Sequence, residues 1–331
     1  MAYTKTHIIS NWLFATAFLV FCMAIIGAIT RLTESGLSMV EWRPLIGTIP
    51  PLSEQEWQRV FDLYKQTPEY QKEHFWMELD DFKYIFFWEW FHRFWGRLIG
   101  LAYGLPLAFF WFKGWIPDHF KPRLLGLLAL GGAQAVMGWY MVESGLVDMP
   151  SVSHYRLAAH LGLAFIIFIA LVWVGLQIRT PDKRPGSDRP VSLKLHYWGC
   201  WAALAVTIVW GAFVAGLDAG LVYNSWPLMG NTFFPAEPFS LTAIFSDPVW
   251  VQFFHRWVAV IAALILLGFA WGTKDILIAA AVFLQVGIGI TTLLSQVWIP
   301  LAALHQAGAF IVVLSLLKNA YEDVYNNPDR L

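Results

Sequence analysis

The chain has 331 residues, of which 58% are hydrophobic and only 14% are charged. Soluble proteins carry roughly a quarter charged residues, so this composition favours an integral membrane protein. The formal net charge of −1 gives no sign of the basic surface that binds nucleic acid, and no nucleic-acid partner is expected. The two cysteines, Cys22 and Cys200, lie inside apolar runs, which argues against a disulfide framework, an iron–sulfur cluster or a cysteine zinc site.

Eight apolar runs are long enough to cross a bilayer, which needs roughly 20 residues per helix. The predicted spans are residues 12–30, 84–112, 124–143, 155–178, 195–216, 249–271, 275–295 and 299–319. Only a few residues around 297–300 separate the last two spans, which predicts a tight hairpin there. The sequence therefore predicts an all-α integral membrane protein with eight transmembrane helices.

Lys and Arg are concentrated in alternate loops, and this asymmetry predicts the orientation in the membrane. Basic residues follow the second, fourth and sixth spans: Lys113, Lys121, Arg123, Arg179, Lys183, Arg184, Arg189, Lys194 and Lys274. The connections 144–153 and 217–248 contain none. Both termini are thus expected to face the cytoplasm.

The first loop, about residues 31–83, is expected outside and to contain a short helix. Ser53 and Glu56 form the pattern of a capping box, which opens a predicted helix over 54–66. One face of this helix is apolar: Trp57, Val60, Phe61 and Tyr64. The helix is expected to lie against the membrane or the helix bundle, or else to be a plain loop helix.

The two halves of the sequence resemble each other, which predicts an internal repeat. Corresponding segments are Gly27-Ala28 and Gly211-Ala212, Pro44-Leu45-Ile46-Gly47 and Pro227-Leu228-Met229-Gly230, Phe91-His92-Arg93 and Phe254-His255-Arg256, and Gln134 and Gly138 with Gln285 and Gly289. Residues 1–180 and 190–331 are each predicted to form a four-helix bundle. An even number of helices per half makes the repeats parallel, which mildly disfavours a transporter.

Four of the nine histidines fall one in each even-numbered span: His92, His160, His255 and His305. Each lies several residues inside the outer end of its helix, roughly 10 Å deep at 1.5 Å per residue. A single intramembrane histidine is often only a hydrogen-bonding contact between helices. Four at one depth, related by the repeat, indicate ligands, because ionisable groups in a membrane are costly and usually functional.

Haem fits this histidine layer better than a bare metal ion does. No acidic or cysteine cluster accompanies the histidines, and two imidazoles in each half suit one bis-histidine haem. Four arginines near the same layer are candidates for contacts to haem propionates: Arg93, Arg97, Arg156 and Arg256. Their side chains could instead extend to the lipid headgroups, and Arg156 is the strongest candidate for that alternative.

The repeat is broken beside one histidine of each half. Glu89 stands three residues before His92, whereas Gln252 stands three residues before His255. This spacing places Glu89 on the same helix face as His92, where it could transfer protons during chemistry on a haem. An ion pair with Arg93 is the alternative. The asymmetry suggests that the first half reacts and the second half holds a static cofactor.

Taken together, these motifs resemble the haem A synthases of the cysteine-free alphaproteobacterial and mitochondrial type. The resemblance covers nearly the whole chain, and its most specific segments are residues 27–47, 89–93 and 211–230 with the four histidines. It implies an oxidoreductase of the bacterial inner membrane that hydroxylates the methyl group of haem O to form the formyl group of haem A, for terminal oxidase assembly.

The resemblance also implies roles for individual residues. His255 and His305 hold a haem b cofactor, and His92 and His160 face the substrate haem O. Arg93 and Arg256 stay candidate haem-binding residues because of their place near the histidine layer. Glu89 is the residue expected to matter for catalysis. Loop 31–83 lacks the cysteine pair found in some bacterial members, so a thiol route for electrons is excluded.

Implied partners are the enzyme that forms haem O and an electron donor that the sequence does not identify. Membrane proteins with flat outer helices often form homo-oligomers, and no motif here fixes a number. The main alternative function is a diheme membrane cytochrome b that only transfers electrons. Glu89 argues against it, because a pure electron carrier gains nothing from one carboxylate. A haem transporter ranks last.

Overall fold

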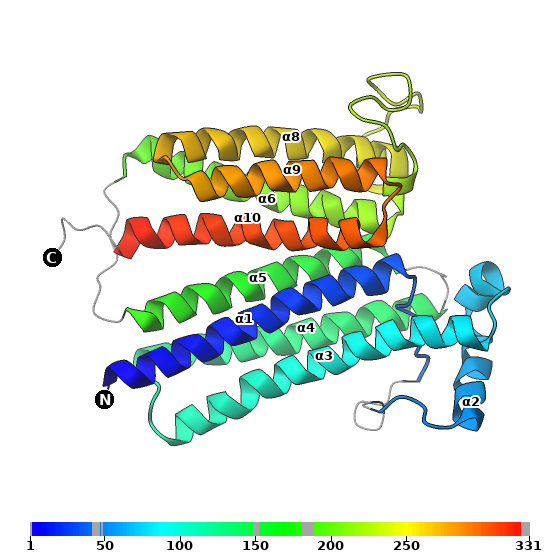
Figure 1. Cartoon of the computed structure of the whole chain (residues 1–331), viewed down its shortest axis with the longest axis horizontal. Helices are drawn as coiled ribbons and strands as arrows, with labels where there is room; N and C mark the ends of the chain where they lie inside the picture. Colours follow the sequence, from blue (N-terminus) through cyan, green and yellow to red (C-terminus); the bar gives the residue numbers. More distant parts are fainter. Residues whose placement is uncertain (1, 42–46, 48, 148–151, 181–188, 326–331) are drawn as a thin grey trace. The chain divides into compact units, whose positions relative to one another are not determined.

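The computed structural model describes residues 2–41, 47, 49–147, 152–180 and 189–325, and these form helices joined by short connections. The long helices are α1 (Ala2–Leu32), α3 (Leu79–Phe112), α4 (Lys121–Val147), α5 (His154–Arg179), α6 (Val191–Gly216), α8 (Pro248–Thr273), α9 (Ile276–Leu294) and α10 (Ile299–Tyr325) (Figure 1). Shorter helical segments are α2 (Glu54–Tyr64), η2 (Tyr70–His74), η3 (Asp118–Phe120), η4 (Ala219–Leu221) and α7 (Ala243–Ser246). The prediction of an all-α protein is confirmed.

Each predicted span corresponds to one long helix, and the span predicted over 275–295 extends one residue beyond α9 at each end. Not every long helix is apolar enough to be assigned to the membrane. Among the described residues, seven helices have the length and hydropathy of a membrane span, and α3 is the long helix that falls short. The charged residues Glu89, Arg93 and Arg97 lie around its middle and lower its mean hydropathy. The structure thus supports a multi-pass membrane protein with seven candidate spans, one fewer than predicted.

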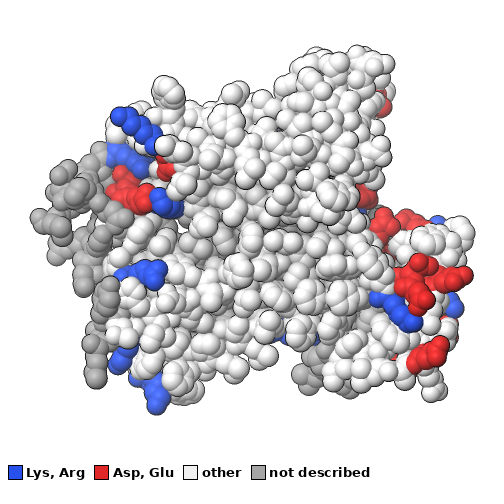
Figure 2. All heavy atoms as spheres, viewed as in Figure 1, with Lys and Arg blue, Asp and Glu red and all other residues white. Residues whose placement is uncertain are grey.

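Charged side chains gather at the ends of the helices, as expected for membrane spans. In the view of Figure 2, Lys, Arg, Asp and Glu lie near the helix ends and in the segment around α2, and the helix sides between them are almost entirely white. Burying charge in hydrocarbon is costly, so such an uncharged belt suits contact with lipid tails.

The chain forms two compact units, one of residues 15–167 and one that combines residues 1–14 with 168–331. In the first unit, helices far apart in sequence are joined by hydrogen bonds to backbone carbonyls. The Trp95 indole on α3 donates to the carbonyl of Leu19 on α1 (2.9 Å), and the Tyr103 hydroxyl donates to that of Leu124 on α4 (2.7 Å).

In the second unit, α6, α8, α9 and α10 pack side by side (Figure 1). The beginning of α1 and the end of α5 also belong to it, where the Arg179 guanidinium donates to the Asn11 side chain at 2.9 Å. The predicted hairpin between α9 and α10 is confirmed. Gln296 and Val297 turn the chain with positive φ angles of 55° and 58°, and the Val297 N–H donates to the Thr292 carbonyl at 2.9 Å.

Residues 33–78, which we call the cap, follow α1 and precede α3. The Ser53 side chain accepts a hydrogen bond from the Glu56 N–H at 3.2 Å, which confirms the predicted start of α2. The Glu56 carboxylate binds Arg59 rather than the Ser53 backbone, so only half of the predicted capping box forms.

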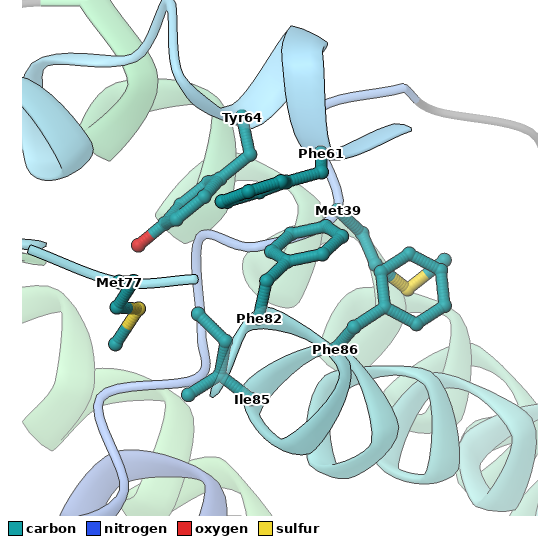
Figure 3. Packing of buried hydrophobic residues seen from close by; sticks show 7 residues of the cluster. All are labelled: Met39, Phe61, Tyr64, Met77, Phe82, Ile85 and Phe86. Atoms are coloured by element: carbon teal, nitrogen blue, oxygen red, sulfur yellow. The ribbon is translucent and has the colours of Figure 1, made fainter. Parts of the chain in front are cut away.

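The apolar face of α2 packs against the start of α3. The rings of Phe61 and Tyr64 stack on Phe82 with centroids 5.0 and 5.2 Å apart, and Trp57 meets Phe86 edge-on at 5.1 Å. Figure 3 shows the rings of Phe61, Tyr64, Phe82 and Phe86 together with Met39, Met77 and Ile85, which complete the cluster. Of the two surfaces predicted for this face, α2 therefore contacts the helices.

The cap also contains a row of four ionisable side chains joined by hydrogen bonds. The Tyr64 hydroxyl donates to the Glu69 carboxyl group at 2.9 Å and contacts Nδ1 of His74 at 2.7 Å. On its other side, Nε2 of His74 lies 2.9 Å from the Glu34 carboxylate. Tyr64, Glu69 and His74 are buried, whereas the Glu34 side chain is 51% exposed, so the row runs from the interior of the cap to its surface.

Burial and hydrogen bonds shift the pKa values of the side chains in this row. Burial raises the pKa of the Glu69 carboxyl group from 4.5 to about 8, although the hydrogen bond from Tyr64 opposes it. The bond between His74 and Glu34 raises the pKa of the imidazole and lowers that of the carboxyl group. At neutral pH, Glu69 therefore holds a proton and Glu34 is ionised.

This shift predicts how the stability of the cap depends on pH. Because Glu69 binds its proton more tightly in the folded state, its contribution is fully present below pH 4.5 and is lost as the pH rises through about 8. We expect Glu69→Gln to stabilise the cap relative to the unsubstituted protein, increasingly from pH 5 to pH 9. Protease susceptibility of the cap at pH 5, 7 and 9 measures this, and a difference that shrinks with pH would contradict it.

Candidate functional site: two pairs of histidines

The four predicted histidines lie as two pairs, one pair in each compact unit. His92 on α3 and His160 on α5 lie in the unit of residues 15–167, close enough that their protonated forms would repel each other. His255 on α8 and His305 on α10 lie in the other unit and interact in the same way. The structure therefore brings together the residues that the sequence assigned to each half.

Glycines allow the neighbouring helix to approach each histidine ring. A Cβ atom at Gly27 of α1 would lie 3.1 Å from Cε1 of His92, and one at Gly211 of α6 would lie 3.1 Å from Cε1 of His255. Ordinary contacts of this kind are longer, so a side chain at either glycine would push the ring away. The repeat of Gly27 and Gly211 in the sequence thus reflects the same helix contact in both halves.

The second histidine of each pair has a glycine and a glutamine against it. A Cβ atom at Gly138 would lie 3.2 Å from His160, and one at Gly289 only 2.7 Å from His305. The amides of Gln134 and Gln285, one helical turn earlier, donate to the carbonyls of His160 and His305 at 3.1 and 2.9 Å.

Each of these glutamine amides also contacts one nitrogen of the histidine ring, at 3.3 Å in the first half and 3.2 Å in the second. The contacted atom is Nε2 in His160 and Nδ1 in His305. One nitrogen of each ring therefore remains for another partner. Hydrogen bonds of this kind orient histidines that ligate metals.

The ring nitrogens fit a bound metal centre. The Nδ1 atoms of His92, His160 and His255 are buried and have no hydrogen-bond partner among the described residues. A buried polar atom without a partner calls for an explanation, and these paired rings, held by glycine and glutamine contacts, would be the residues that hold a haem. Within the described part of the chain, no cluster of three or more His, Cys, Asp or Glu could hold a bare ion.

Glu89 lies one turn before His92 on α3 and binds the beginning of the cap. One carboxylate oxygen accepts from the Ser38 hydroxyl at 2.7 Å and from the Met39 N–H at 2.6 Å. The other oxygen forms the alternative ion pair with Arg93, which also donates to the Met39 carbonyl at 3.1 Å. All of the donors stabilise a carboxylate, and Glu89 is 3% exposed, so its charge is fixed in place.

In the second half, Gln252 and Arg256 stand at the positions of Glu89 and Arg93, and both donate to a loop carbonyl. Tyr223 occupies the place of Met39 in the repeat, and its carbonyl accepts from Gln252 at 3.0 Å and from Arg256 at 2.6 Å. Arg256 also donates to the carbonyls of Ser225 and Leu228 at 2.8 and 3.3 Å. A glutamine suits this site because it donates to a carbonyl, whereas Glu89 accepts from an N–H and a hydroxyl.

The arginines predicted to meet haem propionates have other contacts in the structure. Arg93 and Arg256 bind loop carbonyls, and Arg156 donates to the Tyr140 hydroxyl at 3.2 Å while its guanidinium lies 4.3 Å from the centre of that ring. Sequence alone does not show that backbone carbonyls compete for these guanidinium groups. Their contacts to propionates stay a prediction.

Arg256 should be essential for the loop that follows η4. Arg256→Ala removes one donor from each of three carbonyls. The carbonyls of Tyr223 and Leu228 keep a second donor, the Gln252 amide and the Ser225 hydroxyl, whereas the part-buried Ser225 carbonyl loses its donor, and a buried acceptor left without a partner costs about 1–3 kcal/mol. We expect a lower thermal unfolding midpoint and less haem retained by the His255 pair. Arg156→Ala is the matched control, because its contacts are on an exposed tyrosine, and an equal loss in both variants would contradict the prediction.

The sequence did not reveal Ser38 or the role of the glycines. Ser38 is buried and donates to Glu89, and its counterpart in the repeat is Val222, which lacks a hydroxyl. The repeat did contain a signal for this contact. Ser38 and Glu89 contact each other in the first half, and both are replaced in the second half, by Val222 and Gln252.

The fold and the paired histidines define a multi-pass helical membrane protein with two candidate haem sites, and comparisons with known proteins identify its family. A family model described as "Cytochrome oxidase assembly protein" matches residues 10–317. The chain is therefore a member of the cytochrome oxidase assembly proteins of this type.

Curated relatives narrow the class. The chain is 51% identical over 326 residues to the Heme A synthase of Rhodospirillum centenum, covering 92% of this chain and 85% of the relative. It is 44% identical over 334 residues to that of Maricaulis maris, covering 96% of each, and 42% identical over 325 residues to that of Nitrosospira multiformis, covering 93% and 91%. The chain belongs to the haem A synthase family, as its motifs indicated.

Proposed function

We propose that this haem A synthase oxidises the methyl group of haem O to the formyl group of haem A at the His92 and His160 pair. The observation that carries this assignment is the duplicated histidine site with a carboxylate in one copy only. Both units provide two imidazoles against glycine, but Glu89 is present in the first and Gln252 in the second. A site that changes its ligand needs a group that handles protons, and a static site does not.

In this proposal, His92 and His160 bind the iron of the substrate and fix the position of its ring edge. Glu89 cannot swing away, because Ser38 and Met39 hold one carboxylate oxygen and Arg93 holds the other. A fixed carboxylate one turn from His92 could orient water and take up protons released when the methyl group is oxidised.

The second pair, His255 and His305, would hold haem b, which supplies one-electron transfer at a potential tuned by its ligands and surroundings. Gln285 and Gly289 orient the His305 ring, and Gly211 admits the His255 ring. Arg256 and Gln252 hold the loop around Tyr223. These residues bind and orient, and none of them needs to exchange protons.

For the membrane topology, we propose eight spans arranged as two parallel four-helix halves, residues 1–180 and 190–331. Helix α3 would be the eighth span, because its polar residues Glu89 and Arg93 are paired and bound to the cap. The distribution of Lys and Arg supports cytoplasmic termini and an external cap in a bacterial inner membrane. The implied partners are the haem O-forming enzyme, an electron donor and, through the flat helix sides, further copies of the chain.

The decisive experiment is extraction and mass analysis of the haems that copurify with the protein. Haem B together with haem O or haem A is the expected result. Haem B alone, from cells that also make haem O, would favour the diheme electron carrier instead. This experiment is needed because Glu89 has an anchoring role in the structure, so its presence alone does not separate the two functions.

A further inference from the structure

The row of ionisable side chains in the cap takes no part in the proposed ligation, yet it has the connections of a proton path. Tyr64, Glu69 and His74 are 0%, 5% and 4% exposed, and only Glu34 reaches solvent. Four hydrogen-bonding groups in sequence therefore join a buried acid to the surface, and each can both take up and release a proton.

Two proton arrangements satisfy the row. With Glu69 protonated, its O–H can donate to the Tyr64 oxygen across the same 2.9 Å contact, which reverses the bond that Tyr64 donates to the ionised carboxylate. The Tyr64 O–H then donates to Nδ1 of His74, and Nε2–H of His74 donates to Glu34. When Glu69 gives up its proton, Tyr64 donates to the Glu69 carboxylate and receives the proton of Glu69 in a concerted exchange, which leaves Nδ1 of His74 protonated. The imidazolium can then pass its Nε2 proton to the Glu34 carboxylate.

The buried end of the row is close enough to Glu89 for their charges to interact. The negative charge of Glu89 disfavours ionisation of both Glu69 and Tyr64. The remaining charged groups that face Glu69 are His74 and Glu34. At the surface end, Glu73 also acts on His74, and Arg31 acts on Glu34. Met39 links the two regions, because its N–H binds Glu89 and its side chain packs in the Tyr64 cluster.

We propose that Glu69, Tyr64, His74 and Glu34 form a proton relay that exchanges protons between the cap surface and the Glu89 side of the substrate site. This inference rests on the proposed function, since converting a methyl group to a formyl group breaks C–H bonds and requires protons to move at that site. Glu69 is the internal proton store of the relay, and its occupancy responds to the charge of Glu89.

The burial of the row supports a relay over a purely structural network. A network that only holds the cap together gains nothing from an acid in its interior, because a buried acid is costly to ionise. The pKa of about 8 places Glu69 near the pH of its surroundings, where an acid exchanges protons most readily. Tyr64 is the only link in the row between Glu69 and His74 among the described contacts.

Three variants test the relay in the full-length purified protein. Tyr64→Phe keeps the stacked ring but breaks the row, and Glu69→Gln keeps an acceptor for Tyr64 but carries no exchangeable acid proton. Glu73→Gln is the matched control, because it removes an acid at the surface beside His74 without interrupting the row. Haem content and absorbance spectra of each variant report whether the haem sites remain intact.

The first measurement is the infrared C=O band of a protonated carboxyl group, found as the difference between the unsubstituted protein and Glu69→Gln. We expect this band at pH 7, with loss near pH 8. After transfer to D2O, its isotope shift should develop at least about tenfold more slowly in Tyr64→Phe. Unchanged exchange in Tyr64→Phe, or no band at pH 7, would overturn the relay without any assay of turnover.

The second measurement is the rate of haem A formation from haem O. Tyr64→Phe and Glu69→Gln should both lower it by at least about tenfold at unchanged haem content, whereas Glu73→Gln should not. Equal rates in all variants would reject the relay but leave the synthase assignment intact. Absence of haem A formation in the unsubstituted protein would instead reject the proposed function. If Tyr64→Phe does not fold, Glu69→Gln decides the outcome alone.

Discussion

Gly289→Ala should abolish haem b binding by the second half of the protein. The added Cβ atom would lie 2.7 Å from Cε1 of His305, closer than real side chains approach one another. The ring cannot easily give way, because Gln285 contacts its Nδ1 and donates to the His305 carbonyl. The expected result is purified protein without extractable haem B and without the absorbance spectrum of a bis-histidine haem.

Gly287→Ala is a matched control on the same helix. A Cβ atom at Gly287 meets no other atom within 4 Å, and both substitutions bring the same gain in helix propensity. Gly138→Ala should act on the first half in the same direction but less strongly, because its Cβ atom would lie 3.2 Å from His160. Full haem B content in Gly289→Ala would show that the His305 ring is not held where haem binds.

The helices and the histidine layer were predictable because both depend on local or periodic features. Long apolar runs specify helices in a membrane, where every backbone group must be bonded within its own segment. The repeat then placed His92 beside His160 in one half and His255 beside His305 in the other, without any contact being known. Helix α3 deviates because its polar residues serve the cap, which hydropathy does not reveal.

The cap could not be predicted to the same depth, because its contacts depend on loop geometry. The row from Glu69 to Glu34 joins residues up to 40 positions apart, His74 to Glu34, through a turn after α1 and a π-helical segment. No periodicity marks such pairs. The α2 helix was the exception, since Ser53 and Glu56 are local signals and the apolar face needed a partner.

The arginines show a different limit of sequence reasoning. Arg93 and Arg256 were assigned to propionates because charge complementarity favours that pairing, yet both bind backbone carbonyls of a preceding loop. A carbonyl is invisible in sequence because every residue has one. Only the position of Met39 and Tyr223, each matched by the repeat, reveals that the Glu-x-x-His-Arg and Gln-x-x-His-Arg segments hold a loop.

Glu89→Gln should lower haem A formation by about a hundredfold while haem B stays bound to the His255 pair. The substitution keeps the size of the side chain but removes the charge, so the group no longer accepts protons or pairs with Arg93. Its amide N–H would also face a donor, either the Met39 N–H or Arg93. Rates of haem A formation and the content of each haem measure the effect, and Gln252→Ala, at the matching position of the second half, should retain haem A formation.

The same variants separate chemistry from anchoring. If Glu89 only holds the cap, Glu89→Gln and Ser38→Ala should both increase protease cleavage of the cap, and turnover should fall in proportion to that cleavage. If Glu89 also handles protons, Glu89→Gln should lose turnover beyond what its cleavage accounts for, and Ser38→Thr, which keeps the hydroxyl, should retain it. Normal turnover in Glu89→Gln would mean that the carboxylate is an anchor alone. The difference between Glu89 and Gln252 would then reflect two ways to hold a loop. It would not distinguish a reacting haem site from a static one.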